Sequence, residues 1–212
     1  MGAIEKLKKG FAEFQNGEFR EKATQWKSLV EDGQRPKICV VACSDSRVDP
    51  AILLGAEPGD LFMIRNVANL VHPEDESGSY QGTNAALEYA VEHLKVEHIL
   101  VIGHAFCGGI GSLFGPEQSG EGFNFIPSWM SVAKTAHQRV MDTIPDADES
   151  TQHRACEKEG VKLSLENLMT FDYIRKRVDD GSLNLHGWHV DIGAGNLSCY
   201  NADTNQFELV DE

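Results

Sequence analysis

The sequence predicts an α/β protein with a mostly parallel central sheet, helices on both faces of the sheet, an N-terminal helical arm and a C-terminal antiparallel edge strand. Between residues 37 and 103, runs of strand length alternate with helical segments, which is typical of a parallel sheet covered by helices. Before this region, an aromatic and amphipathic pattern indicates a helical arm over 1–33. We expect a single domain overall, in which 34–212 forms the α/β part.

The apolar residues of the arm recur three or four positions apart, as they do on one face of an α-helix. This pattern covers 4–14, breaks at Asn16-Gly17 and resumes over 19–30, so we expect two amphipathic helices. The apolar stripes include Phe11, Phe14 and Trp26. Stripes this aromatic need a surface to cover, which is either the core of the same chain or a partner.

Five elements are expected in the central region. KICVVA (37–42) is an apolar run of strand length, Pro50 to Leu54 forms a short helix, and LFMIRNVA (61–68) is a second strand. GTNAALEYAVEHL (82–94) has apolar residues at helical spacing, and HILVIG (98–103) is a third strand. The alternation of strand and helix predicts parallel pairing of the three strands.

The last part of the chain changes character. The ranges 127–141 and 156–180 are expected to be helical around the polar loop 144–151. From residue 187 to 210 the sequence indicates a strand, a turn at 201–205 and a closing edge strand.

Charge and cysteine content exclude several classes of function. The formal net charge of −14 should repel phosphate backbones and anionic lipid, so we expect no nucleic-acid partner. No run approaches the roughly 18 uninterrupted apolar residues of a membrane span, so no membrane association is expected. Five irregularly spaced cysteines argue against a secreted disulfide framework. A cytoplasmic location is expected; the alternative is the chloroplast stroma, after removal of a transit peptide.

Two clusters of chemically active side chains follow the first and third predicted strands directly. Cys43-Ser44-Asp45-Ser46-Arg47 ends one strand and His104-Ala105-Phe106-Cys107 ends the other. Because open α/β sheets place their sites at the carboxyl ends of parallel strands, we expect the two clusters to meet. Cys43, His104 and Cys107 would then offer two thiolates and one imidazole, a set that selects zinc and leaves one position open for catalysis. The alternative is that each cysteine is a small buried hydrophobe, as we expect for Cys39, Cys156 and Cys199.

Asp45 and Arg47 are two residues apart, so in an extended segment their side chains leave on the same side and can pair with fork geometry. In that arrangement Arg47 pins the carboxylate of Asp45 beside the metal. The alternative is a structural ion pair that caps the loop.

These motifs resemble the β-class carbonic anhydrases. Cys-x-Asp-Ser-Arg at 43–47 is followed, at position 104, by His-x-x-Cys-Gly-Gly, and "RNVANLV", "ALEYAVEHLKVEHILVIGH" and "GWHVDIGAGNLSCY" are also similar to that family. The resemblance implies one Zn²⁺ per chain, held by Cys43, His104 and Cys107. It further implies that zinc-bound hydroxide hydrates CO₂ reversibly to bicarbonate and a proton, with Asp45 and Arg47 orienting the hydroxide. Phe106 departs from the family, where this position is often small or polar.

The resemblance also implies a substrate site at a dimer interface. Gln34 corresponds to a glutamine that hydrogen-bonds CO₂ or bicarbonate, Phe62 and Tyr89 to an apolar lining, and Gly108 lies beside the metal. The expected assembly is a dimer or a higher even oligomer, in which the resemblance makes 1–33 a dimerisation arm that wraps around a second subunit. From the residues alone, Gln34 could equally be an exposed turn residue, and Phe62 and Tyr89 plain core.

Within the resembled family, one subtype has a tryptophan three residues before the first cysteine ligand, and its aspartate switches onto zinc. Here that position holds Val40, which implies the open, non-switching subtype.

Three rival functions are weighed against this interpretation. A cysteine-nucleophile enzyme would use Cys43 activated by His104, but the loop lacks a glycine-rich anion cradle and the Cys-x₅-Arg spacing of phosphatases. A non-catalytic zinc or redox-binding protein would have Asp45 as a fourth ligand. A related zinc hydrolase of CS₂ or COS would keep the same ligands and change only access to them.

Overall fold

A computed structural model describes residues 1–74, 82–115 and 125–210 of the chain. The chain divides into two compact units, Met1–Arg35 and Pro36–Glu212. No helix in the described ranges is both long enough and apolar enough to cross a lipid bilayer.

The first unit consists of the helices α1 (Ala3–Asn16), α2 (Glu18–Glu21) and α3 (Ala23–Glu31). The break at Gly17 is as expected, but the second predicted helix is divided at Lys22, for which the sequence offers no signal. The Phe14 ring packs edge-on against Trp26 at 5.7 Å between ring centroids. None of the residues in these helices is buried, and Phe11 is 60% exposed, so the first unit does not cover its own apolar stripe.

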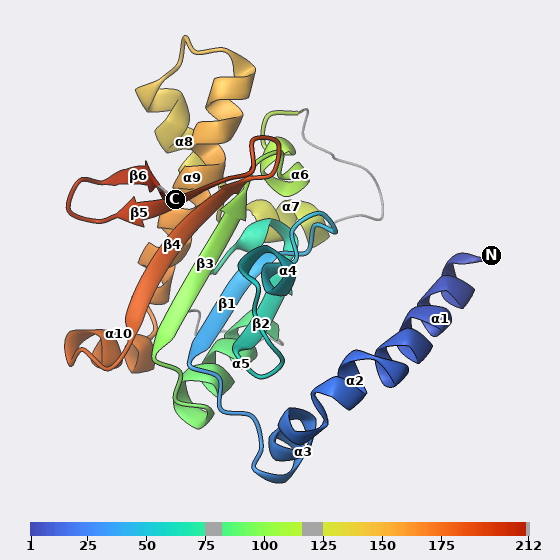
Figure 1. Cartoon of the computed structure of the whole chain (residues 1–212). Helices are drawn as coiled ribbons and strands as arrows, with labels where there is room; N and C mark the ends of the chain where they lie inside the picture. The colour runs from blue at the N-terminus through green and yellow to red at the C-terminus, as the bar shows by residue number, and fades with distance from the viewer. Residues whose placement is uncertain (75–81, 116–124, 211–212) are drawn as a thin grey trace. The chain divides into compact units, whose positions relative to one another are not determined.

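The second unit contains a six-stranded sheet in the order β2-β1-β3-β4-β5-β6 (Figure 1). The strands are β1 (Ile38–Cys43), β2 (Leu61–Asn66), β3 (His98–His104), β4 (Asn184–Asp191), β5 (Asn196–Asn201) and β6 (Gln206–Leu209). The first four are paired in parallel, and β5 and β6 are antiparallel, which confirms the predicted mixed sheet. The C-terminal region forms three strands rather than the predicted two. The Asp191 carboxylate accepts hydrogen bonds from the N–H groups of Gly193 and Ala194 and so reverses the chain between β4 and β5.

Seven helices belong to the second unit within the described ranges: α4 (Pro50–Leu54), α5 (Gly82–Glu88), α6 (Gly108–Gly111), α7 (Phe125–Met130), α8 (Lys134–Thr143), α9 (Glu149–Leu168) and α10 (Asp172–Asp179). The predicted helix over 82–94 is α5 followed by a π-helical turn, Tyr89–His93. α9 begins inside the predicted loop 144–151, because the Asp148 carboxylate accepts from Thr151 N and caps the helix.

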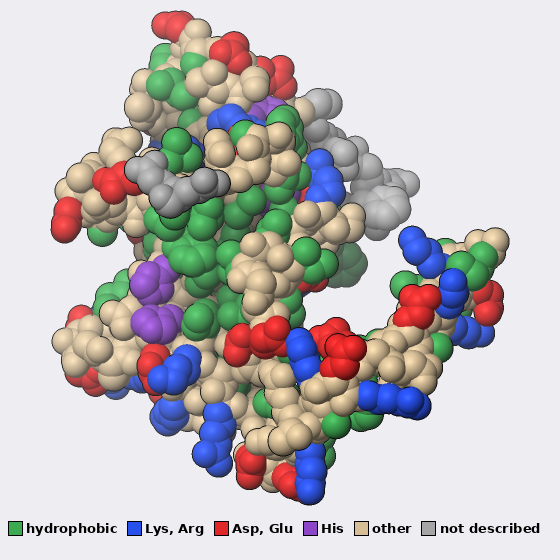
Figure 2. Space-filling view, in the orientation of Figure 1, with side chains coloured by type: hydrophobic (Ala, Val, Ile, Leu, Met, Phe, Trp, Pro, Cys, Tyr) green, Lys and Arg blue, Asp and Glu red, His purple; other side chains and the backbone are tan. Residues whose placement is uncertain are grey.

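The sheet carries helices on both faces, but unequally. On one face α5, α9 and α10 pack over a core that includes Val41, Leu87, Ile99, Val161, Leu168 and Ile174. On the other face the short α4 places Leu54 over a smaller cluster that includes Val40, Leu100 and Ile102. Figure 1 shows α4 in front of the sheet and α9 behind it. Among the described residues, α4 is the helix of this unit whose side chains join that cluster, and Figure 2 shows hydrophobic side chains gathered on the front of the sheet.

Two glycines let α9 approach the sheet closely. A Cβ on Gly103 of β3 would lie 2.6 Å from Cγ2 of Val161, and a Cβ on Gly187 of β4 would lie 2.9 Å from Cγ1 of the same side chain. Side chains at these positions would therefore push the helix away. Glu157 is one helical turn before Val161, so this close contact brings its carboxylate to the carboxyl end of β3.

Candidate metal centre

The two predicted clusters meet at the carboxyl ends of adjacent strands. β1 ends at Cys43 and β3 at His104, and the two strands pair in parallel up to Ala42 and Ile102. The strand order changes direction here, since β2 lies on one side of β1 and β3 on the other, and such a point is where open α/β sheets form a crevice. One ligand atom from each of Cys43, His104 and Cys107 lies within 4.8 Å of the others.

The two thiols are spaced for a metal rather than for a disulfide. Their sulfurs are 4.0 Å apart, and both cysteines are buried and free. Two sulfurs at zinc distance, about 2.3 Å, with a tetrahedral angle between them would be separated by about 3.8 Å. A disulfide would need about 2.0 Å. The pair therefore fits zinc without rearrangement.

One ring nitrogen of His104 is available to bind a metal ion. Its Nδ1 lies 2.9 Å from the carbonyl oxygen of Ala105 and donates to it, which leaves Nε2 with a free lone pair. Nε2 is buried and has no hydrogen-bond partner among the described residues. A buried polar atom left in this state costs about 1–3 kcal/mol, and a metal ion would remove the cost.

The thiols shift each other's pKa in opposite directions. The hydrogen bond that they share lowers the pKa of Cys43 and raises that of Cys107, and burial raises the pKa of Cys107 further. Backbone N–H groups of Asp45 and Ala68 also favour the thiolate form of Cys43. These contacts favour the thiolate form of Cys43, the form in which cysteine binds metals.

Asp45 and Arg47 pair as predicted, but the reason is different. Residues 46 and 47 form a tight turn rather than an extended segment, and Arg47 N donates to Oδ1 of Asp45 at 2.9 Å. The guanidinium then closes a fork, with Nε 2.9 Å from Oδ1 and Nη2 2.7 Å from Oδ2. These hydrogen bonds hold the pKa of the Asp45 carboxyl well below its usual range. The carboxylate therefore stays ionised and accepts only.

Arg65 holds the loop that carries this pair, and the sequence analysis missed it. From β2 its guanidinium donates to the carbonyl oxygens of Cys43, Asp45 and Val48 at 2.7–3.0 Å, and it pairs with Asp49 at 3.3 Å. The available signal was an arginine inside an otherwise apolar strand, since a charged side chain in such a place needs partners.

Phe106 lies in the turn between two ligand residues and has a left-handed backbone conformation, with φ at 61°. For a residue other than glycine this costs about 1–3 kcal/mol. Its carbonyl oxygen accepts from Nη2 of Arg47 at 2.9 Å, so the turn also supports the Asp45–Arg47 pair.

A buried carboxylate contacts the backbone of a predicted ligand. Oε1 of Glu157 accepts from the N–H of Cys107 at 3.1 Å, and Oε2 lies 3.1 Å from Nε2 of His189. The sequence analysis assigned no role to either residue. The signal for Glu157 was a carboxylate on the side of α9 that also carries Gly160 and Val161, which are buried.

Among the predicted substrate residues, Phe62 and Tyr89 do not lie at the metal centre of their own chain. Phe62 and Tyr89 contact each other, with ring centroids 5.9 Å apart. Phe62 is four residues before Asn66, the partner of Cys43 in the sheet, which is about 13 Å along a strand. Gln34 is an exposed residue of the first unit. A Cβ on Gly108 would meet nothing within 4 Å; the close approach is at Gly109, where a Cβ would lie 2.9 Å from that of Ala68.

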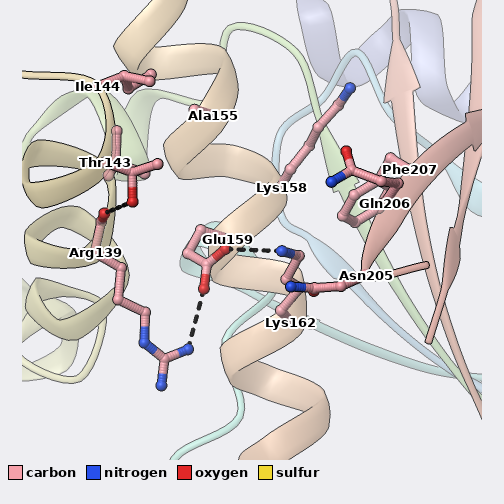
Figure 3. A pocket seen from close by; sticks show the side chains of 11 residues that line it. Arg139, Thr143, Ile144, Ala155, Lys158, Glu159, Lys162, Asn205, Gln206 and Phe207 are labelled. Atoms are coloured by element: carbon pink, nitrogen blue, oxygen red, sulfur yellow. Dashed lines mark hydrogen bonds and ion pairs between the residues drawn. The ribbon is translucent and has the colours of Figure 1, made fainter. Parts of the chain in front are cut away.

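A separate cavity of about 560 Å³ lies between α8, α9 and the β5–β6 hairpin (Figure 3). Arg139, Lys158, Lys162 and Phe207 are among the residues that line it. Arg139 reaches Glu159 across the cavity at 3.1 Å. None of the predicted site residues lines this cavity, so it is distinct from the metal centre.

The family model described as carbonic anhydrase matches residues 38–197 of the chain. Beta carbonic anhydrase 3 of Arabidopsis thaliana is 37% identical over 205 residues, which make up 96% of this chain and 79% of the relative. A second protein of that plant, beta carbonic anhydrase 5, chloroplastic, is 42% identical over 186 residues, which make up 88% of this chain and 61% of the relative.

Solved structures agree in fold. The β-carbonic anhydrase CcaA superposes with a TM-score of 0.91 at 30% identity and covers 99% of this chain and 92% of its own. One of two tetrameric β-carbonic anhydrases from Sordaria macrospora has a TM-score of 0.82 at 29% identity, over 94% of this chain and 97% of its own.

Proposed function

The chain belongs to the β-class carbonic anhydrases, zinc-dependent lyases that hydrate CO₂ reversibly, and from that premise we propose which of its residues perform the reaction. The observation that carries the proposal is the convergence of two thiols and a partnerless imidazole nitrogen within 4.8 Å. The direct test is stopped-flow CO₂ hydration followed with a pH indicator, together with metal analysis. Hydration of CS₂ or COS in place of CO₂ would contradict the proposal.

Cys43, His104 and Cys107 are the zinc ligands of this proposal. Bound zinc supplies a water of lowered pKa as the nucleophile, lowered less than at an all-histidine site because two thiolates cancel the charge of the ion. His104 presents Nε2 because its Nδ1–H is engaged by the carbonyl of Ala105. The buried thiolates need no movement to bind, since their spacing already matches tetrahedral zinc.

Asp45 positions the nucleophile by accepting a hydrogen bond from it. Oδ1 of Asp45 accepts from both the backbone N–H and Nε of Arg47, and Oδ2 accepts from Nη2 alone, which leaves a lone pair of Oδ2 for the nucleophile. Because Asp45 is held ionised, it orients the nucleophile and does not protonate it. The contribution is positional, and the pair forms no covalent intermediate.

The pH profile is expected to rise from neutral to alkaline pH as a single titration. The pKa of Asp45 is depressed, so its pairing with Arg47 is present above that pKa and is lost only on strong acidification. Val40 is fully buried among aliphatic side chains, and Asp45 is held by Arg47, an arrangement that supports the open subtype. Initial rates across this pH range provide the measurement. A steep cooperative loss of activity, non-competitive inhibition by bicarbonate, or a crystal at about pH 7.5 or above with Asp45 bound to zinc would contradict it.

The functional unit of the proposal is a dimer or a higher even oligomer. Phe62 and Tyr89 lie far from the metal centre of their own chain, which fits a lining supplied to a neighbouring subunit, and Gln34 is assigned to the same shared site. Gly108 lies directly after the ligand Cys107, where its backbone approaches substrate. The exposed stripe of 1–33 and the hydrophobic side chains that Figure 2 shows on the front of the sheet supply surfaces for a second copy.

Deletion of residues 1–33 is expected to give poorly soluble or dissociated chains with impaired catalysis. The deletion removes the aromatic stripe and the exposed apolar face of the arm while leaving the metal ligands in place. Sedimentation velocity and CO₂ hydration on the same sample provide the measurement. A soluble, fully active monomer would refute the role of the arm.

A compartment that keeps thiols reduced is proposed as the location, because the ligand set needs two unoxidised cysteines. The cytoplasm is the first choice and the chloroplast stroma the alternative; the relative named chloroplastic supports the latter.

A further inference from the structure

One turn of α9 contacts the turn between the ligand residues His104 and Cys107. Arg154 and Glu157 are three residues apart on this helix and pair with each other, with Nη2 2.7 Å from Oε1. The Glu157 side chain is only 2% exposed, and its two oxygens also contact the N–H of Cys107 and the imidazole of His189. A carboxylate beside an arginine accepts only, so Nε2 is the protonated nitrogen of His189.

The Phe106 ring lies under the guanidinium of Arg154. The distance from Cζ of Arg154 to the ring centroid is 4.2 Å, within the range of a cation–π contact. On another side, a Cβ added to Gly193 would lie 3.2 Å from the ring, so this loop leaves little room for the ring to move. The ring is therefore held although it is 56% exposed.

The remaining N–H groups of Arg154 support this arrangement. Nε and Nη1 are buried and have no hydrogen-bond partner among the residues that the structure describes. Their favourable surroundings are the ring face of Phe106 and the negative charge of Glu157. An arginine with no further role at this place would be expected to reach solvent with these groups.

We propose that Arg154 and Glu157 are positioning residues of the metal centre. Glu157 fixes the backbone of Cys107, and so the direction in which its sulfur faces. Arg154 fixes the ring of Phe106, whose carbonyl oxygen holds Nη2 of Arg47 and through it the carboxylate of Asp45. Neither residue touches substrate. The role of Arg154 rests on the proposed function, because it acts through Asp45. The role of Glu157 concerns the geometry of the metal centre alone.

Two variants test these two roles separately. Glu157→Gln keeps a side-chain oxygen that accepts from the N–H of Cys107 but removes the negative charge of the carboxylate. Arg154→Met removes the guanidinium from the Phe106 ring. Arg154→Lys returns a cation to the ring without the planar fork, so it should restore part of what Arg154→Met loses.

Arg139 and Glu159 provide matched controls. They form a similar ion pair onto α9, with Nη1 3.1 Å from Oε1, at the cavity of Figure 3 and away from the ligand turn. Arg139→Met, on α8, and Glu159→Gln, on α9, therefore remove the same chemical groups from an ion pair outside the ligand turn. They report any general loss of helix stability.

The measurements are kcat, KM and the visible spectrum of the protein loaded with Co(II) in place of zinc. We expect Arg154→Met to lower kcat about tenfold or more with little change in KM, because substrate contacts are intact. We expect Glu157→Gln to shift the thiolate-to-cobalt absorption and to speed loss of the metal to a chelator. Both controls should match the wild type in all these readouts.

A wild-type kcat in Arg154→Met would overturn the positioning role of Arg154. A wild-type cobalt spectrum in Glu157→Gln would overturn the positioning role of Glu157. Equal losses in the control variants would show that Arg154 and Glu157 contribute only to the general stability of the fold. If Arg154→Met fails to fold, Phe106→Asn replaces it, since asparagine tolerates the left-handed backbone and removes only the ring. Absence of CO₂ hydration in the wild type would refute the proposed function, while the cobalt spectra would still test the role of Glu157.

Discussion

Cys107→Ala is expected to abolish both zinc binding and CO₂ hydration. The change leaves Cys43 and His104 as the only protein ligands of the cluster, and two ligands hold zinc poorly. It also removes the thiol whose hydrogen bond lowers the pKa of Cys43, so the remaining thiol is less readily deprotonated for metal binding. Purified wild-type protein should contain about one zinc per chain, and the variant close to none, by elemental analysis.

Cys199→Ala is the matched control for this prediction. Cys199 lies on β5 outside the ligand cluster, so its variant should keep both zinc and activity. Far-ultraviolet circular dichroism of each variant separates loss of the ligand from loss of the fold. Full CO₂ hydration by metal-free protein would end the zinc hypothesis.

Asp45→Asn is expected to keep zinc and to lower kcat/KM by one or more orders of magnitude, about the range for removal of a positioning group. The amide of asparagine offers one acceptor oxygen where Arg47 now uses two, and its NH₂ would face the donors of the guanidinium. The fork would open, and the acceptor for the nucleophile would be lost. Stopped-flow rates, with zinc measured on the same samples, test this outcome.

Asp148→Asn is the corresponding control, because asparagine caps a helix as well as aspartate does and Asp148 lies at the start of α9. Its activity should equal that of the wild type. A near-wild-type rate for Asp45→Asn would instead show that the Asp45–Arg47 pair is only a structural ion pair of the loop.

Features whose signals are local can be predicted from the amino-acid sequence alone. Asp49, Pro50 and Gly55 cap, begin and end α4, and the helix has the predicted bounds. The apolar runs predicted the strands up to β3, and parallel adjacent strands necessarily end together, so the convergence of Cys43 with His104 followed from the pattern. The division of the long predicted helix at residues 169–171 had no comparable signal.

How the ligands are held depends on contacts that form only when distant segments pack together. Arg65 reaches the Cys43 carbonyl across 22 positions of sequence, and Glu157 reaches the Cys107 N–H across 50. Both contacts depend on strand register and on the close approach of α9 at Gly103 and Gly187. Hydrophobic periodicity reports which face of an element is buried; it carries no information about which distant polar group will meet it there. The turn that brings Asp45 to Arg47 was open to prediction from its aspartate, whereas the network behind Cys107 exists only once the helix has packed on the sheet.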